Sequence, residues 1–294
     1  PRLEVLADGS IFSTGDITKR DVFRLRFPLT VFDKPITALR LEVLPDERLP
    51  AGGPGRSYYE GRKGDFFLSE VNAKTGDVAV KFSDASHSYG KISIGGGGAA
   101  AANVLDGNGS SGWSTAQREG QAHQLVLNLA EPVMPEGELE VTMLFERHFA
   151  ASLGRFRWSA TTDKLPAKAK DMPAALEAIL SQDASKWSEE ERREAERFFV
   201  RRTPDLRAAR KPIDALRRQL PKLPTTLVMQ ERPADNPRPT HRHHRGEYTQ
   251  PKERVTAGLP SLFASSKPQP ANRLELARWL VSRENPLAGR VAVN

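Results

Sequence analysis

The stretch Ala38-Leu39-Arg40-Leu41-Glu42-Val43 alternates apolar and polar side chains with a period of two residues. Successive side chains of a β-strand point to opposite faces of a sheet, so this spacing is typical of a strand that buries one face. Three other stretches have the same pattern: Val22-Phe23-Arg24-Leu25-Arg26-Phe27, Gln124-Leu125-Val126-Leu127-Asn128-Leu129 and Leu139-Glu140-Val141-Thr142-Met143-Leu144-Phe145. We expect a half-buried strand at each of them.

The region around these four stretches, residues 21–162, has no helical periodicity. Turn residues separate the apolar runs, as in Leu49-Pro50-Ala51-Gly52-Gly53-Pro54-Gly55. Short alternating runs between turns are the signature of an antiparallel β-sandwich. The glycine run at 95–98 is expected to be a loop, because four glycines lose too much backbone entropy to be held in a strand. The sequence therefore predicts a mostly β fold.

The sequence pattern changes after residue 162, where helix-start signals replace the period-two alternation. We expect helices from Met172-Pro173, from a capped start at Ser188, and from Thr203-Pro204-Asp205 to Leu220. Beyond them we expect a short strand at 225–229, a largely irregular segment at 231–270 and a last amphipathic helix at 273–282. The predicted domains are a β-sandwich at 1–163, a basic helical linker at 164–224 and an incomplete, α-rich domain at 225–294.

Composition excludes several kinds of chemistry from this chain. Its 294 residues contain no cysteine, which rules out disulfides, thiolate metal sites and covalent c-type haem attachment here. No stretch approaches the roughly 20 apolar residues that cross a bilayer. The net charge of +7 is uneven, since residues 164–294 hold 26 Lys and Arg against 16 Asp and Glu. These charges alternate with Glu and lack an aromatic platform, so nucleic acid is not the expected partner.

Both ends of the sequence resemble cuts in a longer polypeptide. The chain begins at Pro1 and stops in the apolar run Val291-Ala292-Val293-Asn294. We therefore expect the rest of its own polypeptide to be one of its partners.

A glycine-rich loop carries the clearest chemistry of the β region. It reads Asn103-Val104-Leu105-Asp106-Gly107-Asn108-Gly109-Ser110-Ser111-Gly112-Trp113. Its carboxylate, amide, hydroxyl and backbone oxygens are the ligand types that Ca²⁺ prefers. The alternative is an Asp-Gly turn without a metal ion.

This loop resembles the discoidin family, also called galactose-binding-like domains, in which an Asn-Ala-x-Asp-Gly turn leads to Ser or Thr and then to Trp. The strands at 39–43 and 67–71 resemble the closing strands of that family but come first here, which implies a circularly permuted member. The resemblance implies a structural Ca²⁺ held by Asp106, Asn108, Ser111 and Glu70. It also implies that Trp113 is a core residue and does not stack on a sugar.

Aromatic residues on turn-rich stretches are the candidates for carbohydrate contact. Tyr58, Tyr59 and Tyr89 offer rings on which a sugar could stack, and His87 offers a hydrogen-bonding partner. For each of them, surface decoration is the alternative interpretation.

The segment Thr240-His241-Arg242-His243-His244-Arg245-Gly246-Glu247 gathers three histidines. Imidazoles and the carboxylate of Glu247 suit Zn or Cu. Arg242 and Arg245 would oppose a bound cation, which favours a structural or anion-binding role. The sequence leaves the role of His241, His243 and His244 open.

A second resemblance covers residues from about 225 onward. Arg238-Pro239-Thr240-His241, Asn272-Arg273-Leu274-Glu275-Leu276-Ala277-Arg278-Trp279-Leu280 and Asn285-Pro286-Leu287 are similar to planctomycete cytochrome-type proteins, in which paired domains of unknown function flank a variable centre. The resemblance implies a periplasmic, secreted or cell-envelope setting and a link to polysaccharide use. In that family haem c lies in a separate domain, which here would be outside this sequence.

Three hypotheses for function follow. The first is a non-catalytic carbohydrate-binding or adhesion module of a larger envelope protein, with a glycan as its ligand. The alternative is part of a polysaccharide-active or haem-linked redox enzyme whose catalytic residues lie outside this sequence. The third is a purely structural spacer. We find no Gly-x-Ser-x-Gly elbow and no Walker loop. The sequence therefore leaves enzymatic activity undecided and favours the first hypothesis.

Overall fold

The computed structural model divides the chain into two compact units, residues 1–220 and 221–294. It describes residues 1–93, 98–147, 149–164, 166–221, 239–259, 261–263, 272–283 and 285–293. The short strand predicted at 225–229 and most of the glycine loop at 95–98 lie outside the described residues.

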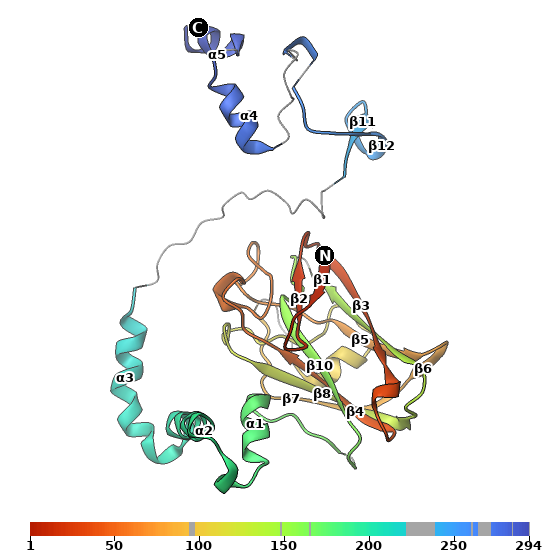
Figure 1. The fold of residues 1–294 in the computed structure, drawn as a ribbon, viewed down its shortest axis with the longest axis vertical. Coiled ribbons are helices and arrows are strands. Elements are labelled where there is room, and N and C mark those ends of the chain that lie inside the picture. The colour runs from red at the N-terminus through yellow and green to blue at the C-terminus, as the bar shows by residue number, and fades with distance from the viewer. Residues whose placement is uncertain are drawn as a thin grey trace. The chain divides into compact units, whose positions relative to one another are not determined.

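The first unit is built on two antiparallel sheets (Figure 1). The six-stranded sheet has the order β1-β2-β10-β4-β8-β7, and the four-stranded sheet has the order β3-β9-β5-β6. The strand bounds are β1 Arg2–Val5, β2 Ile11–Thr14, β3 Arg20–Pro28, β4 Ile36–Val43, β5 Glu70–Thr75, β6 Val78–Val80, β7 Phe82–His87, β8 His123–Val133, β9 Glu138–Glu146 and β10 Arg155–Thr161. The predicted mostly β, antiparallel fold is confirmed.

The four alternating stretches form β3, β4, β8 and β9. Strands β4, β8 and β9 lie in the interior of their sheets, and the edge strand β3 pairs with β9 along its full length. Short 3-10 turns connect the strands and the structure describes no α-helix between residues 20 and 160. These turns are η1 Leu29–Val31, η2 Pro50–Gly52 and η3 Ala101–Leu105.

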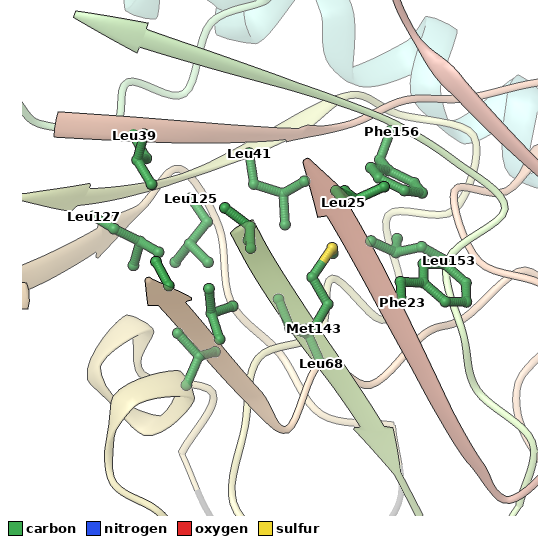
Figure 2. Packing of buried hydrophobic residues seen from close by; sticks show 14 of the residues in the cluster. Phe23, Leu25, Leu39, Leu41, Leu68, Leu125, Leu127, Met143, Leu153 and Phe156 are labelled. Atoms are coloured by element: carbon green, nitrogen blue, oxygen red, sulfur yellow. The ribbon is translucent and has the colours of Figure 1, made fainter. Parts of the chain in front are cut away.

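One hydrophobic core fills the space between the two sheets. Leu39, Leu41 and Val43 of β4 are at most 4% exposed, as their period-two spacing predicts. Phe23 of the four-stranded sheet stacks on Phe156 of the six-stranded sheet, with ring centroids 5.8 Å apart. Figure 2 shows Leu39, Leu41, Phe23 and Phe156 converging from strands of both sheets. The core is therefore shared, and neither sheet buries its apolar face without the other.

Helices follow the sheets in the first unit, where the sequence predicted them. They are α1 Ala174–Leu180, α2 Glu189–Arg202 and α3 Arg207–Gln219, with short 3-10 turns η4 Ala184–Lys186 and η5 Pro204–Leu206 between them. The predicted start at Ser188 is a capping box, in which Ser188 and Glu191 satisfy each other's backbone N–H groups.

The segment that leads into α1 is tied to the six-stranded sheet. The Asn128 side chain donates to the Ala167 carbonyl and accepts from the Ala167 N–H. Arg40 of β4 forms a 2.9 Å ion pair with Glu177 of α1. The first turns beyond residue 163 thus belong physically to the β unit.

The second unit differs from its prediction in the hairpin β11–β12 and in a helix after the one predicted at 273–282. Residues 231–270 were expected to be largely irregular, but β11 Thr240–His244 and β12 Glu247–Val255 form an antiparallel hairpin. Arg245 and Gly246 at its turn both have positive φ, which is the conformation of a two-residue hairpin turn. The turn signal was an Arg-Gly pair, which is weaker than Asn-Gly. A 3-10 turn and two helices follow, η6 Ser261–Phe263, α4 Arg273–Leu280 and α5 Pro286–Val293.

The contact between the sheets yields a stability prediction. Phe23→Ala removes a ring that is 1% exposed and leaves a cavity opposite Phe156, so we expect a loss of about 3 to 5 kcal/mol in unfolding free energy. Chemical denaturation followed by circular dichroism measures it. The matched control is Phe199→Ala, whose ring is 62% exposed and whose loss should stay within about 0.5 kcal/mol. Equal effects of the two substitutions would contradict a core shared between the sheets.

Candidate functional site

The loop at 106–111 is closed by its own side chains. Oδ1 of Asp106 accepts the backbone N–H of Asn108 at 2.8 Å, and Oδ2 accepts the Ser111 hydroxyl at 2.6 Å. The Asn108 side chain accepts the Ser110 N–H at 3.1 Å. Gly107 has φ +73°, a conformation that glycine adopts without strain. Three of the four predicted calcium ligands therefore meet in one turn.

Trp113 fixes the end of this loop to the core. Its side chain is fully buried, and its indole N–H donates to the Tyr89 carbonyl at 2.9 Å. Its backbone exchanges two 2.9 Å hydrogen bonds with Leu68, two residues before β5 begins. The prediction that Trp113 is a core residue is confirmed. Its anchoring brings the loop beside the first residue of β5.

That first residue is Glu70, the fourth predicted ligand. It is 7% exposed, and its Oε1 atom has no hydrogen-bond partner among the described residues. Burial raises the pKa of Glu70, and the nearby Asp106 carboxylate raises it further, while the backbone amides of Gly107 and Asn108 act in the opposite direction. The Ser111 hydroxyl is the main cause that lowers the pKa of Asp106, and Glu70 lowers it also. Two carboxyl groups close enough to share a proton behave in this way.

This arrangement has the chemistry of a hard-cation site. A buried carboxylate with an unpaired oxygen lies beside a second carboxylate, with amide, hydroxyl and backbone oxygens around them. No group of three or more His, Cys, Asp or Glu side chains in the described part of the chain is placed to hold a metal ion. An ion at this loop would therefore take neutral oxygens for the rest of its shell, and Ca²⁺ accepts such ligands.

The four predicted carbohydrate contacts are placed unequally. Tyr89 carries the Arg118 guanidinium 4.0 Å from its ring centroid and lies 5.3 Å from the His123 ring, while its hydroxyl donates to the Ala116 carbonyl. Lys63 lies over the Tyr58 ring at 4.7 Å. His87, at the end of β7, is half-buried and its Nδ1 has no partner among the described residues. Tyr59 is 76% exposed, so its ring is the most accessible to a sugar.

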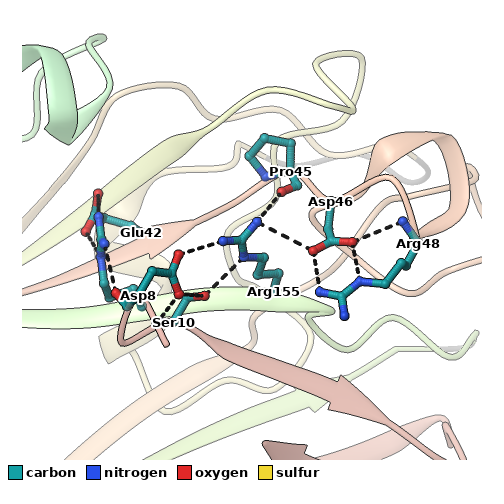
Figure 3. Close-up of polar contacts among 8 residues, drawn as sticks. Asp8, Ser10, Glu42, Pro45, Asp46, Arg48 and Arg155 are labelled. Atoms are coloured by element: carbon teal, nitrogen blue, oxygen red, sulfur yellow. Dashed lines mark hydrogen bonds and ion pairs between the residues drawn. The ribbon is translucent and has the colours of Figure 1, made fainter. Parts of the chain in front are cut away.

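A polar hollow, which sequence reasoning missed, opens beside the connection between β4 and β5. Its volume is about 540 Å³, and it is lined by Pro45, Asp46, Glu47, Arg48, Gly52, Gly120 and Arg155. Figure 3 shows Arg155 between Asp8 and Asp46, with Nη2 2.6 Å from the Asp8 carboxylate. Arg48 makes two 2.7 Å hydrogen bonds to Asp46. The Ser10 hydroxyl, which donates to Asp8 at 2.6 Å, is the main cause that lowers the pKa of Asp8 to about 2. Arg48 is the main cause that lowers the pKa of Asp46.

No periodicity could have identified this hollow, because its residues come from three separate parts of the chain. The only sequence signal was the density of charged and glycine residues at 45–55.

A second buried polar cluster centres on His123, which is 3% exposed. Ser88 accepts the Gln124 N–H and lies 3.2 Å from Nδ1 of His123, while Nε2 has no partner among the described residues. Burial, aided by Arg118, lowers the pKa of His123 to about 4. A Ser-His contact can form part of a nucleophilic site, but here the His123 ring is 3% exposed and Ser88 also accepts the Gln124 N–H. We interpret it as structural.

The three histidines of the second unit lie on β11. His241 Nδ1 is 2.8 Å from the Lys252 carbonyl, and Arg242 forms an ion pair with Glu253. Glu247 accepts the Thr249 hydroxyl. The hairpin thus uses these residues in cross-strand and turn contacts, while His243 and His244 remain exposed.

The His123 environment predicts a pH-dependent stability. The ordinary pKa of histidine is near 6.5, so as pH falls from 6.5 toward 4 the unfolded chain binds a proton that the folded chain does not bind. Stability is therefore full above pH 6.5 and declines down to pH 4, by about 3 kcal/mol at 1.36 kcal/mol per pKa unit. Denaturation at each pH should show this slope weakened in His123→Asn. It should be retained in His243→Gln, which alters an exposed histidine, and an unchanged slope in His123→Asn would refute the assignment.

No protein family, no curated protein and no solved structure matches the chain. The function is therefore inferred from the site itself.

Proposed function

We propose that the β unit is a non-catalytic, discoidin-like carbohydrate-binding module in which a structural Ca²⁺ holds the loop at 106–111 against β5. The observation that carries the proposal is the buried Glu70 carboxylate, with an unpaired oxygen, beside Asp106. A buried carboxylate oxygen that has no hydrogen-bond partner costs free energy. A cation shared by the two carboxylates would remove both the desolvation cost and their repulsion.

The chain order around this site supports a circularly permuted discoidin-like sandwich. The strand with Glu70 precedes the loop with Asp106 by 36 positions, yet the Leu68 and Trp113 backbones pair directly. Core strands β4 and β8 are neighbours in the same sheet. The resemblance of residues from about 225 to planctomycete cytochrome-type proteins further supports a periplasmic or secreted setting. Among the described residues, no helix has the length and apolar character needed to cross a bilayer.

The polar hollow is the part of the unit best suited to a glycan. Its volume lies in the range of ligand pockets, and its carboxylates and guanidinium groups can bond sugar hydroxyls. Asp8, Asp46, Arg48 and Arg155 are already held by one another, so little side-chain entropy would be lost on binding. Tyr59 does not line the hollow; its ring, 76% exposed on the connection between β4 and β5, offers a separate surface on which a sugar could stack.

Two changes in thermal stability test the calcium site: the change on adding Ca²⁺ and the change caused by Glu70→Gln in chelator. Excess Ca²⁺ should raise the melting temperature, corresponding to about 2.7 kcal/mol at 100 times the dissociation constant, and Asp106→Asn should abolish the increment. Asp77→Asn, an exposed site on the β5–β6 turn, should keep it. In chelator, Glu70→Gln should be neutral or stabilising because it removes a buried charge. A destabilising Glu70→Gln in chelator, or identical melting with and without Ca²⁺, would reject the ion.

Carbohydrate binding is tested by a glycan array probed with the chain, using immobilised neutral and acidic oligosaccharides. We expect selective binding to one class, weakened about tenfold or more by Tyr59→Ala, since the loss of one stacking contact of about 1.4 kcal/mol is a factor of ten. Val78→Ala, a similarly exposed apolar side chain on β6, is the control and should bind normally. Uniform absence of binding would leave the module a structural spacer or an enzyme scaffold and defeat the proposal.

A further inference from the structure

An apolar cavity lies at one end of the core, under the segment that crosses from the four-stranded to the six-stranded sheet. Its volume is about 150 Å³ and it is partly open to solvent. The crossing segment connects β3 to β4 through η1 and forms one wall. The lining residues are Phe27, Pro28, Leu29, Val31, Phe32, Ile36 and Leu39 of this segment and its flanking strands, with Leu139 and Val141 of β9 and Trp158, Ser159 and Ala160 of β10.

The wall has no charged side chain. Its single hydroxyl, that of Ser159, already accepts a hydrogen bond from Arg40 Nε at 3.2 Å. A sugar or an ion entering the cavity would lose water without gaining partners, which costs free energy for every polar group buried. This cavity is therefore unsuited to the glycan proposed for the polar hollow, and it calls for a ligand of a different class.

Water is also a poor occupant of the cavity. An ordered water molecule needs two to four polar partners, which this wall does not offer, and apolar cavities of about 150 Å³ take up benzene-sized molecules. The rim is accessible, because Val31 of η1 is 70% exposed while Leu29 in the same turn is 1% exposed. Trp158 is a lining residue whose indole N–H is buried and has no partner among the described residues.

We propose that the cavity binds a small, uncharged, apolar molecule of about six to eight heavy atoms, an aromatic ring or branched hydrocarbon with at most one hydrogen-bond acceptor. The bound molecule would fill a void in the core where the chain crosses from one sheet to the other. It is independent of both the calcium ion and the glycan.

The experiment titrates the whole chain with ethylbenzene and with anisole, two probes of matched size of which only anisole has an acceptor. Methyl resonances are followed by NMR. We expect saturable shifts with both probes for the methyl groups of Leu29, Ile36, Leu39, Leu139 and Val141, while methyl groups remote from the cavity do not move. Benzoate, which adds a charge, should bind at least tenfold more weakly than either probe. Binding of benzoate as tight as that of ethylbenzene would overturn the proposed ligand class.

Ala160→Leu places extra carbon atoms in the cavity and should weaken both probes at least tenfold. The matched control, Ala130→Leu, makes the same change at an exposed position of β8 and should leave binding intact. If Ala160→Leu does not fold, Val31→Asp tests the rim instead, because that side chain is exposed and a carboxylate there should also weaken binding tenfold. Absence of saturable shifts in the wild type, or equal binding by a folded rim or cavity variant, would overturn the proposal.

Discussion

The burial of Trp113 is the constraint on which the candidate site depends. Its ring packs edge-on against Phe66 with centroids 5.2 Å apart, its N–H is satisfied by the Tyr89 carbonyl, and its backbone pairs with Leu68. These contacts come from three segments that are distant in sequence and hold them at one end of the core. The loop before Trp113 and the strand after Leu68 thereby become neighbours, and that proximity places Asp106 beside Glu70.

The two sheets form the scaffold of the unit, and the connections between their strands carry its polar features. Their shared core explains why strands with period-two spacing occur in both, and why the aromatic contact between Phe23 and Phe156 links them. The connections carry the polar features: the stretch between β4 and β5 supplies most of the polar hollow and Tyr59, and the stretch between β7 and β8 supplies the loop at 106–111. A rigid two-sheet scaffold that presents functional loops is a common arrangement in binding proteins.

Sequence reasoning predicted the strands with strict alternation and the capped helices, because both depend on local spacing. It did not identify β1, β2, β6, β7 or β10. The sequence of β7, Phe82-Ser83-Asp84-Ala85-Ser86-His87, is polar at an edge of the sheet and has little apolar signal. Sequence reasoning also missed the β11–β12 hairpin, since its turn lacks Asn-Gly. The meeting of Glu70 with Asp106 came from family resemblance, because no local pattern joins positions 36 apart. The polar hollow, the buried His123 and the apolar cavity depend on tertiary packing alone and could not be predicted.

The central claim is that Glu70 and Asp106 form one site that holds either a proton or a calcium ion. The carboxyl carbon resonance of Glu70, followed by NMR across pH with and without Ca²⁺, tests this directly. In chelator, the account predicts that Glu70 titrates above the ordinary pKa of glutamate, because burial and Asp106 disfavour its charge. In excess Ca²⁺ the same group should stay ionised to lower pH, because the ion displaces the proton. A Glu70 titration that is ordinary in chelator and identical in Ca²⁺ would contradict the account.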